Sequence, residues 1–274
     1  MLSLAVRHTA LKHLLKVTAS YSTTTTIDHE EITKFNKHGK QWWNDSSEVK
    51  LLLSMNEIRV PFIRDGLINC GIVSDDHIET CKPLSGLKVL DVGCGGGFLA
   101  EALARIGAET IGVDGSKDLI DAAIDHKQMD EEIKDNLHYE HTCIEEFSKS
   151  HENVFDAVVS SEVIEHVVNK EDFVKHCAAC LKPGGSIFMT TINKTTIANV
   201  LAIFVAENIL QIVPKGAHDY DKLMAPHELQ RMFEENCCYT RRIHGFTYNP
   251  VTKRWCWIPS SDINYAIHAV KAKE

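Results

Sequence analysis

The sequence predicts an α/β protein built on a doubly wound, mostly parallel β-sheet. Short aliphatic segments alternate with segments of helical periodicity between residues 88 and 191. A glycine-rich turn follows the first aliphatic segment, and an aspartate ends the second. Strands and helices that alternate in this way form parallel sheets whose ligands bind at the carboxyl ends of the strands. We therefore expect one α/β domain with its ligand site at that edge of the sheet.

The composition is that of a globular protein and excludes several classes. The chain has 274 residues, of which 44% are hydrophobic and 24% are charged. It contains no run of apolar residues long enough to span a bilayer. A net charge of −9 argues against a nucleic-acid binder, which needs a basic surface. The nine cysteines have no regular spacing, so we expect Cys177 and Cys180 to be buried in a helix rather than to bind zinc.

Residues 1–27 have the composition of a mitochondrial transit peptide. They contain Arg7, Lys12 and Lys16 but no Asp or Glu, and they are rich in Ser and Thr. A basic, acid-free, amphipathic start is typical of such peptides, whereas a secretory signal has a continuous apolar centre. We therefore expect a mitochondrial location. The alternative is a disordered tail.

Residues 28–85 are expected to form a helical cap ahead of the sheet. The run Asp28-His29-Glu30-Glu31 suits a helix N-terminus, where negative charge is favourable. Residues 51–68 also have helical spacing, which Pro61 is expected to interrupt. Because these helices precede the first strand of the main domain, we expect them to cover the ligand pocket.

The turn after the first strand predicts a nucleoside-binding site. Strand 88–92 runs into a turn whose glycines, among them Gly93 and Gly95, allow tight bending and close approach to a ligand. Asp114 ends strand 109–113, where a carboxylate accepts hydrogen bonds from ribose hydroxyls. Phe98 stands where a dinucleotide fingerprint has its third glycine, and Asp91 precedes the first glycine by two residues. The pattern favours a nucleoside that carries a charged amino acid over NAD.

This pattern, D-x-G-x-G-x-G followed by a strand that ends in Asp, resembles the class I methyltransferase family. The resemblance implies a Rossmann-like sheet of seven strands and S-adenosylmethionine as the cofactor. It also implies that adenine lies beside residues 143–146, so that Ile144 becomes an expected cofactor-binding residue. The remaining strands are expected at 137–141, 155–160 and 186–191, with a helix around 170–181 before the last of them.

The segment after the fourth strand carries the candidate catalytic residues. If a helix begins at Ser161, then Glu162, Glu165 and His166 share one face. Two carboxylates and an imidazole can hold a divalent cation, which would chelate both oxygens of a catechol and lower the pKa of its phenol. Without a metal, His166 can act as general base with Glu165 orienting it. Both interpretations stay open, and a third is a purely structural role for these polar residues.

Blocks scattered along the chain resemble the ubiquinone biosynthesis O-methyltransferase family. They are residues 28–31, Phe35, Trp42-Trp43, Asn56–Arg59, Val89–Gly97, Glu162–His166, Pro214–Asp219 and Tyr248–Pro250. The resemblance covers nearly everything after residue 27. It implies that Arg59, Gly93, Asp114 and Ser161 bind the cofactor, with the Arg59 guanidinium gripping its carboxylate at two points. It further implies magnesium at Glu162, Glu165 and His166, although an imidazole ligand leaves zinc or manganese open.

The same resemblance implies a substrate, a location and partners. The family's substrates are polyprenylated catechols, so we expect peripheral association with the matrix side of the mitochondrial inner membrane. Membership of a multi-subunit biosynthetic complex is also expected. Residues 195–214 are apolar enough to lie in a membrane interface, and burial in the protein is the alternative. The competing function is a cofactor-binding scaffold subunit without catalysis, while a dehydrogenase is disfavoured by Asp91 and Phe98.

Overall fold

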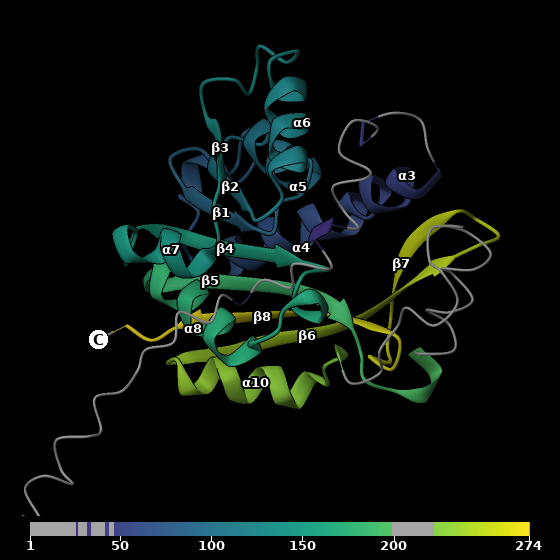
Figure 1. The fold of residues 1–274 in the computed structure, drawn as a ribbon. Helices are drawn as coiled ribbons and strands as arrows, with labels where there is room; N and C mark the ends of the chain where they lie inside the picture. Colours follow the sequence, from purple (N-terminus) through teal and green to yellow (C-terminus); the bar gives the residue numbers. More distant parts are fainter. Residues whose placement is uncertain (1–25, 27–31, 34–41, 44–46, 199–221, 274) are drawn as a thin grey trace, which may run out of the picture.

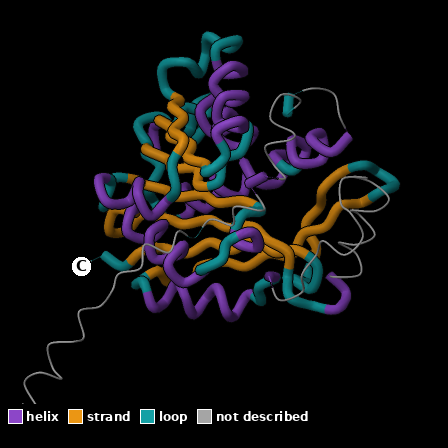
Figure 2. Tube along the Cα trace, viewed as in Figure 1, coloured by secondary structure: helices purple, strands orange, loops and turns teal. Residues whose placement is uncertain are grey.

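One mixed β-sheet forms the centre of the molecule (Figures 1 and 2). The computed structural model describes residues 26, 32–33, 42–43, 47–198 and 222–273. Within these residues the sheet has eight strands in the order β3-β2-β1-β4-β5-β8-β6-β7. The strands are β1 (Lys88–Val92), β2 (Glu109–Asp114), β3 (Leu137–His141), β4 (Phe155–Ser161), β5 (Leu181–Ile192), β6 (Cys238–Asn249), β7 (Arg254–Ile258) and β8 (Asn264–Lys271). The first five in spatial order are parallel, and β8, β6 and β7 are antiparallel to their neighbours.

Helices cover both faces of this sheet, as the doubly wound prediction requires. They are α3 (Ser47–Ser54), α4 (Asn56–Asn69), α5 (Phe98–Arg105), α6 (Lys117–Lys127), α7 (Ile144–Phe147), α8 (Lys170–Cys180) and α10 (Pro226–Glu235). Short 3₁₀ helices occur at Asp75–His77, Ser148–Ser150 and Ile164–His166. In Figure 1, α7, α8 and α10 lie across one face of the sheet, while α4 and α5 lie behind it.

Two hydrophobic cores separate these layers. On one side, Phe173 of α8 and Phe233 of α10 pack with strand residues into a single buried cluster. On the other, Leu67 of α4 and Leu103 of α5 pack with Val89 of β1 in a second cluster. Each core buries the apolar face of its helices against the sheet, which is the main source of stability in such a layered fold.

Strand β1 lies at the point where the direction of winding reverses. From β1 the chain builds β2 and β3 on one side, and β4 and β5 on the other. At such a switch point the loops that follow β1 and β4 diverge, and they leave a crevice at the carboxyl ends of the strands. The predicted binding residues after β1, β2 and β4 therefore meet at one edge.

Three details of the fold differ from expectation. The sheet has eight strands instead of seven, because β7 pairs with β6 as an additional antiparallel edge strand. Pro61 does not interrupt its helix but lies inside α4, whose Ile58, Ile63 and Leu67 remain buried on one side. The chain does not begin a helix at residue 161. The amide of Glu162 continues the pairing with β5 by donating to Thr190 O at 2.9 Å, so only a 3₁₀ turn forms at Ile164–His166.

Several predictions fall wholly or partly outside the described residues. These are the transit peptide up to residue 25, the helix start at 28–31 and most of the proposed interface segment, from residue 199 onward. Thr26 is described and is buried; its amide donates to the Glu145 carboxylate and its carbonyl accepts from Val168 N at 2.9 Å. Among the described residues, no helix has the length and apolar character needed to cross a membrane. Cys177 and Cys180 are fully buried in α8, as predicted.

Candidate functional site

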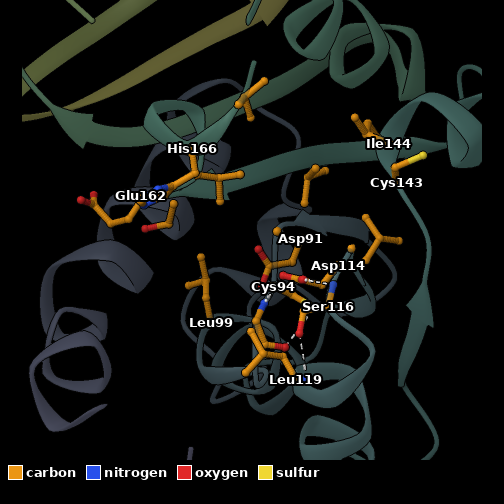
Figure 3. A pocket seen from close by; sticks show the side chains of 18 of the residues that line it. Asp91, Cys94, Leu99, Asp114, Ser116, Leu119, Cys143, Ile144, Glu162 and His166 are labelled. Atoms are coloured by element: carbon orange, nitrogen blue, oxygen red, sulfur yellow. Dashed lines mark hydrogen bonds between the residues drawn. The ribbon is translucent and has the colours of Figure 1, made fainter. Parts of the chain in front are cut away.

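A cavity of about 200 Å³ opens at the switch point of the sheet (Figure 3). Its wall comes from the turn after β1, the end of β2, the start of α7 and the segment after β4. Residues from the chain ahead of the sheet, among them Trp42 and Arg59, complete it. The cap therefore does contribute to the pocket, as the sequence predicts. All predicted site residues except Glu165 line this cavity: Arg59, Asp91, Gly93, Gly95, Asp114, Ile144, Ser161, Glu162 and His166.

Glycine is required at position 93 by the backbone and by the neighbouring turn. Gly93 has φ +72°, a region that side chains disfavour. A Cβ at this position would also lie 2.5 Å from Cγ2 of Val163. The two turns, one after β1 and one after β4, thus approach each other more closely than a side chain at residue 93 allows.

Asp114 organises the glycine turn from the end of β2. One carboxylate oxygen accepts the Gly95 amide at 2.9 Å, and the other accepts the Ser116 amide at 2.7 Å. Burial raises the pKa of Asp114, and these two amide donors oppose that shift. Each carboxylate oxygen can accept more than one hydrogen bond, so both can still receive a ligand hydroxyl.

Asp91 presents a buried acceptor without a partner. Its side chain is only 2% exposed, and Oδ2 has no hydrogen-bond partner among the described residues. The pKa of Asp91 is raised to about 7, mainly by burial; nearby Arg59 and the Ala100 amide oppose the shift, and Asp114 adds to it. A buried carboxylate in this state is stabilised by a cationic ligand. The cavity therefore offers a site for an ammonium group.

Arg59 is buried and already engaged by protein groups. Its Nη1 donates to Ser161 Oγ at 2.7 Å, and Nη2 donates to Leu52 O at 2.9 Å and to Asn56 Oδ1 at 2.6 Å. Nε donates to the same Asn56 oxygen at 3.1 Å. Burial lowers the pKa of Arg59 to about 10, while Glu162 and Asp91 oppose that change. In this arrangement both edges of the guanidinium are occupied. Binding a carboxylate at two points requires either Asn56 to move or both Ser161 and the Leu52 carbonyl to move.

Arg59 begins a one-directional chain of hydrogen bonds that ends at Glu162. Arginine can only donate, so Ser161 Oγ accepts from it and uses its own hydrogen for Thr190 Oγ1, which lies 2.6 Å away. Thr190 Oγ1 in turn donates to Glu162 Oε1 at 2.8 Å. The chain joins the cap helix α4 to the ends of β4 and β5.

Glu162, Glu165 and His166 are close in space but do not converge on one point. Glu162 and His166 line the cavity and lie next to each other in Figure 3. Glu165 is buried and accepts a hydrogen bond from Thr191 Oγ1 at 2.9 Å. The pKa of Glu162 is raised to about 7, first by burial and then by the neighbouring charge of Glu165. Across the described ranges, no group of three or more His, Cys, Asp or Glu side chains is arranged to hold a metal ion.

The structure adds site residues that sequence reasoning does not select. Thr190 and Thr191 of β5 hold the two glutamates, and Val163 limits the residue at position 93. Thr26 and Trp42 lie in the cavity wall. A position at the carboxyl end of a predicted parallel strand is the one signal that could have indicated the two threonines.

Comparisons with known proteins identify the family of this chain. A methyltransferase domain family matches residues 73–242. The ubiquinone biosynthesis O-methyltransferase of Rattus norvegicus, a mitochondrial protein by name, is 43% identical over 253 residues, covering 92% of this chain and 72% of the relative. The human mitochondrial protein of the same name is 42% identical, with 92% and 68% covered. The Psychrobacter arcticus protein is 37% identical, with 90% and 96% covered.

The chain belongs to the ubiquinone biosynthesis O-methyltransferase family. It is accordingly an S-adenosylmethionine-dependent methyltransferase, as the glycine turn and Asp114 predict. The rat and human relatives are named mitochondrial, which indicates the mitochondrion as the compartment.

Solved structures of low sequence identity share the fold of this family member. Magnesium protoporphyrin IX methyltransferase from Synechocystis PCC 6803 with bound SAH superposes with a TM-score of 0.61 at 18% identity, covering 89% of this chain and 99% of the other. The same enzyme with bound SAM gives a TM-score of 0.54. The class I methyltransferase architecture is therefore confirmed.

Proposed function

We propose that this enzyme transfers the S-adenosylmethionine methyl group to a hydroxyl of a polyprenylated catechol in ubiquinone biosynthesis. The observation that carries the proposal is that Glu162 and His166 line the same cavity as Asp91 and Asp114. A cofactor held by the two aspartates would thus lie in one cavity with the polar groups that can handle a phenol proton.

The cofactor-binding roles follow from the chemistry of each group. Asp114 would accept from the ribose hydroxyls, and Asp91 would face the ammonium group of the methionine end. Gly93 and Gly95 would let the backbone approach the nucleoside, and Ile144 would pack on the adenine. Arg59 and Ser161 would lie near the methionine carboxylate, where Arg59 supplies positive charge.

The chemical step needs a phenolate aligned with the methyl group. His166 would accept the proton of the attacking hydroxyl, after which the phenolate oxygen forms its bond to the methyl carbon as the carbon–sulfur bond breaks. The sulfonium becomes a neutral thioether and the phenolate becomes a neutral ether, so both charges decrease in the transition state. Glu165, which is buried and held by Thr191, would orient His166, its neighbour in the chain.

A divalent cation forms the finer part of the proposal. The donor types suit one, and the mutual repulsion of Glu162 and Glu165 would be relieved by a positive ion between them. Glu162, Glu165 and His166 would hold it, with magnesium first and zinc or manganese as alternatives. Glu165 would then have to exchange its hydrogen bond with Thr191 for the ion. Such a cation lowers the pKa of a bound phenol and orients both catechol oxygens.

A methyl-transfer assay with a short-tailed catechol tests both levels of the proposal. Transfer to the catechol, with none to a phenol that lacks the second hydroxyl, supports the substrate class and the chelating ion. If the metal is used, a strong chelator abolishes activity, and Glu162→Gln loses transfer while retaining cofactor affinity. If His166 acts without metal, the chelator has no effect and Glu162→Gln remains nearly normal. Absence of transfer to any catechol by protein that binds the cofactor would favour the scaffold function.

We also propose the organisation and location that the sequence predicts. Residues 1–27 would act as the transit peptide and residues 28–274 as the methyltransferase domain, peripheral to the matrix side of the inner membrane and joined to a multi-subunit complex. The mitochondrial names of the eukaryotic relatives support the compartment. A reporter fused to residues 1–27 should enter mitochondria and be cleaved; an uncut cytosolic reporter would contradict this.

A further inference from the structure

Trp42 covers the glycine turn at Gly95 and Gly96. The indole lines the cofactor cavity, and its side chain is 9% exposed. The ring packs over Gly96, where a Cβ would lie 2.0 Å from Cδ1 of Trp42, and its six-membered part reaches toward Gly95. It also stacks on Phe98, with ring centroids 5.6 Å apart. The absence of a side chain at Gly96 therefore makes room for Trp42, not for a ligand.

Trp42 also carries a buried donor for which the described residues provide no acceptor. Within the described part of the chain, five buried side-chain atoms have no hydrogen-bond partner, and only Trp42 Nε1 and Asp91 Oδ2 belong to residues that line the cavity. Leaving such a group unpaired costs about 1–3 kcal/mol, so a partner in the bound state is expected. One is a donor and the other an acceptor. Together they complement a ligand that offers both an ammonium group and oxygen acceptors, as S-adenosylmethionine does.

The next residue fixes the position of Trp42. Trp43 Nε1 donates to Gly96 O at 2.8 Å, and its ring stacks on His126 with centroids 3.3 Å apart and an interplanar angle of 2°. His126 Nδ1 lies 2.7 Å from Oε1 of Glu101, a fully buried residue of α5. The tryptophan pair is thus anchored to α5 and α6, which flank the glycine turn.

We propose that Trp42 is a further cofactor-binding residue and that Trp43 and His126 position it. Trp42 presents its ring to the bound nucleoside, its unpaired indole N–H lies beside Gly96, and Trp43 locks the pair onto the glycine turn. The site thereby takes one side from the chain ahead of the sheet, and affinity for the cofactor depends on two residues that precede the methyltransferase domain match at 73–242.

Calorimetric titration of the full chain with S-adenosylmethionine tests the proposal. Trp42→Phe keeps a ring but loses the N–H, and it should weaken binding about fivefold. Trp42→Ala removes both and should weaken binding about 30-fold. Trp257→Phe is the matched control, because Trp257 lies on β7 outside the cofactor cavity, and its affinity should stay unchanged. Affinities of both Trp42 variants within twofold of wild type would overturn the proposal.

A spectroscopic readout separates binding from folding. In a chain that keeps both Trp42 and Trp43 and has Trp255 and Trp257 replaced by Phe, saturating cofactor should change the emission, and adding Trp42→Phe should remove most of that change. An emission change of the same size with and without Trp42 would contradict contact between Trp42 and the cofactor. For the positioning role, His126→Ala should weaken binding about threefold, and His126→Phe, which retains the stack on Trp43, should restore it. Equal losses in the two His126 variants would mean that stacking on Trp43 does not position Trp42.

Discussion

The turn after β1 and the turn after β4 lie at neighbouring strand ends, but one is shaped mainly by its backbone and the other by side-chain hydrogen bonds. The first is made from backbone: Gly93 has a positive φ and no room for a Cβ, and Asp114 binds its amides. The second is made from side chains: Glu162 and Glu165 are held by Thr190 and Thr191 from β5.

This difference explains how each half tolerates change. A turn shaped by its backbone is disrupted when a side chain is added, because the new atoms overlap with neighbouring residues. A side-chain-built site can lose one hydrogen bond and keep its shape, because the remaining contacts hold the turn. We therefore expect the largest effects in the glycine turn and graded effects around the glutamates.

The largest effect is expected for Gly93→Ala. A Cβ at this position would lie 2.5 Å from Val163 Cγ2, and residue 93 has φ +72°. The positive φ and the overlap should together lower the free energy of unfolding by about 2–4 kcal/mol, as measured by urea denaturation. Adding Val163→Ala should recover only the steric part. A Gly93→Ala protein as stable as wild type would remove the distinction between the two turns.

Asp114→Ala should come next. It removes the acceptor for the ribose and the partner of the Gly95 and Ser116 amides, so cofactor binding should weaken by about 1–3 kcal/mol in calorimetry. Asp118→Ala, an exposed change in α6, is the matched control and should leave affinity unaltered. Equal affinities for the two variants would exclude Asp114 from the site.

The pH dependence of cofactor binding should report Asp91. Its pKa is raised to about 7, mainly by burial, so it becomes neutral as the pH falls through that value. A neutral acid does not attract an ammonium group, and affinity should therefore decrease by up to about tenfold per pH unit below 7. Asp91→Asn should bind weakly at every pH with this dependence removed. A wild-type affinity for the cofactor that increases as the pH falls would contradict the role of Asp91 as the partner of the ammonium group.

The smallest effect is expected for Thr190→Val. The change removes the hydroxyl between Ser161 and Glu162 but keeps the β-branched shape, so kcat should fall about two- to tenfold. The dissociation constant for the cofactor should be unchanged, and Thr190→Ser should restore kcat. A loss of cofactor affinity instead would show that the chain of hydrogen bonds serves Arg59 and not Glu162.

The sequence predicts well which residues of the glycine turn and the strand ends line the cavity, because the signals for them are local in the chain. In a parallel sheet of this kind, a glycine or an acid at the carboxyl end of a strand lies at the ligand-binding edge. Asp91, Gly93 and Asp114 all line the cavity as expected. Aliphatic segments likewise locate β1, β2 and β4 closely, because buried parallel strands are rich in apolar residues. Strand β3 has its predicted range although its sequence is polar, and β5 begins at Leu181 instead of at residue 186.

The acceptor half depends on contacts that are distant in the chain. Helical spacing after Ser161 is a sound local prediction, but the amide of Glu162 pairs with Thr190, and β4 continues instead. No local pattern contains that partner. The same applies to β7, which exists through pairing with β6, and to Pro61, whose helix is kept by packing of its apolar side.

Glu162 has a further consequence for how this enzyme can evolve. It is a non-glycine residue at φ +57°, a conformation that costs about 1–2 kcal/mol for a side chain. Selection for thermal stability alone would favour glycine there, and the resulting protein would resist heat better than its parent while losing its carboxylate. At position 162, a substitution that increases thermal stability is thus expected to decrease turnover. A screen of variants for thermal stability alone should therefore enrich inactive proteins with glycine at this position.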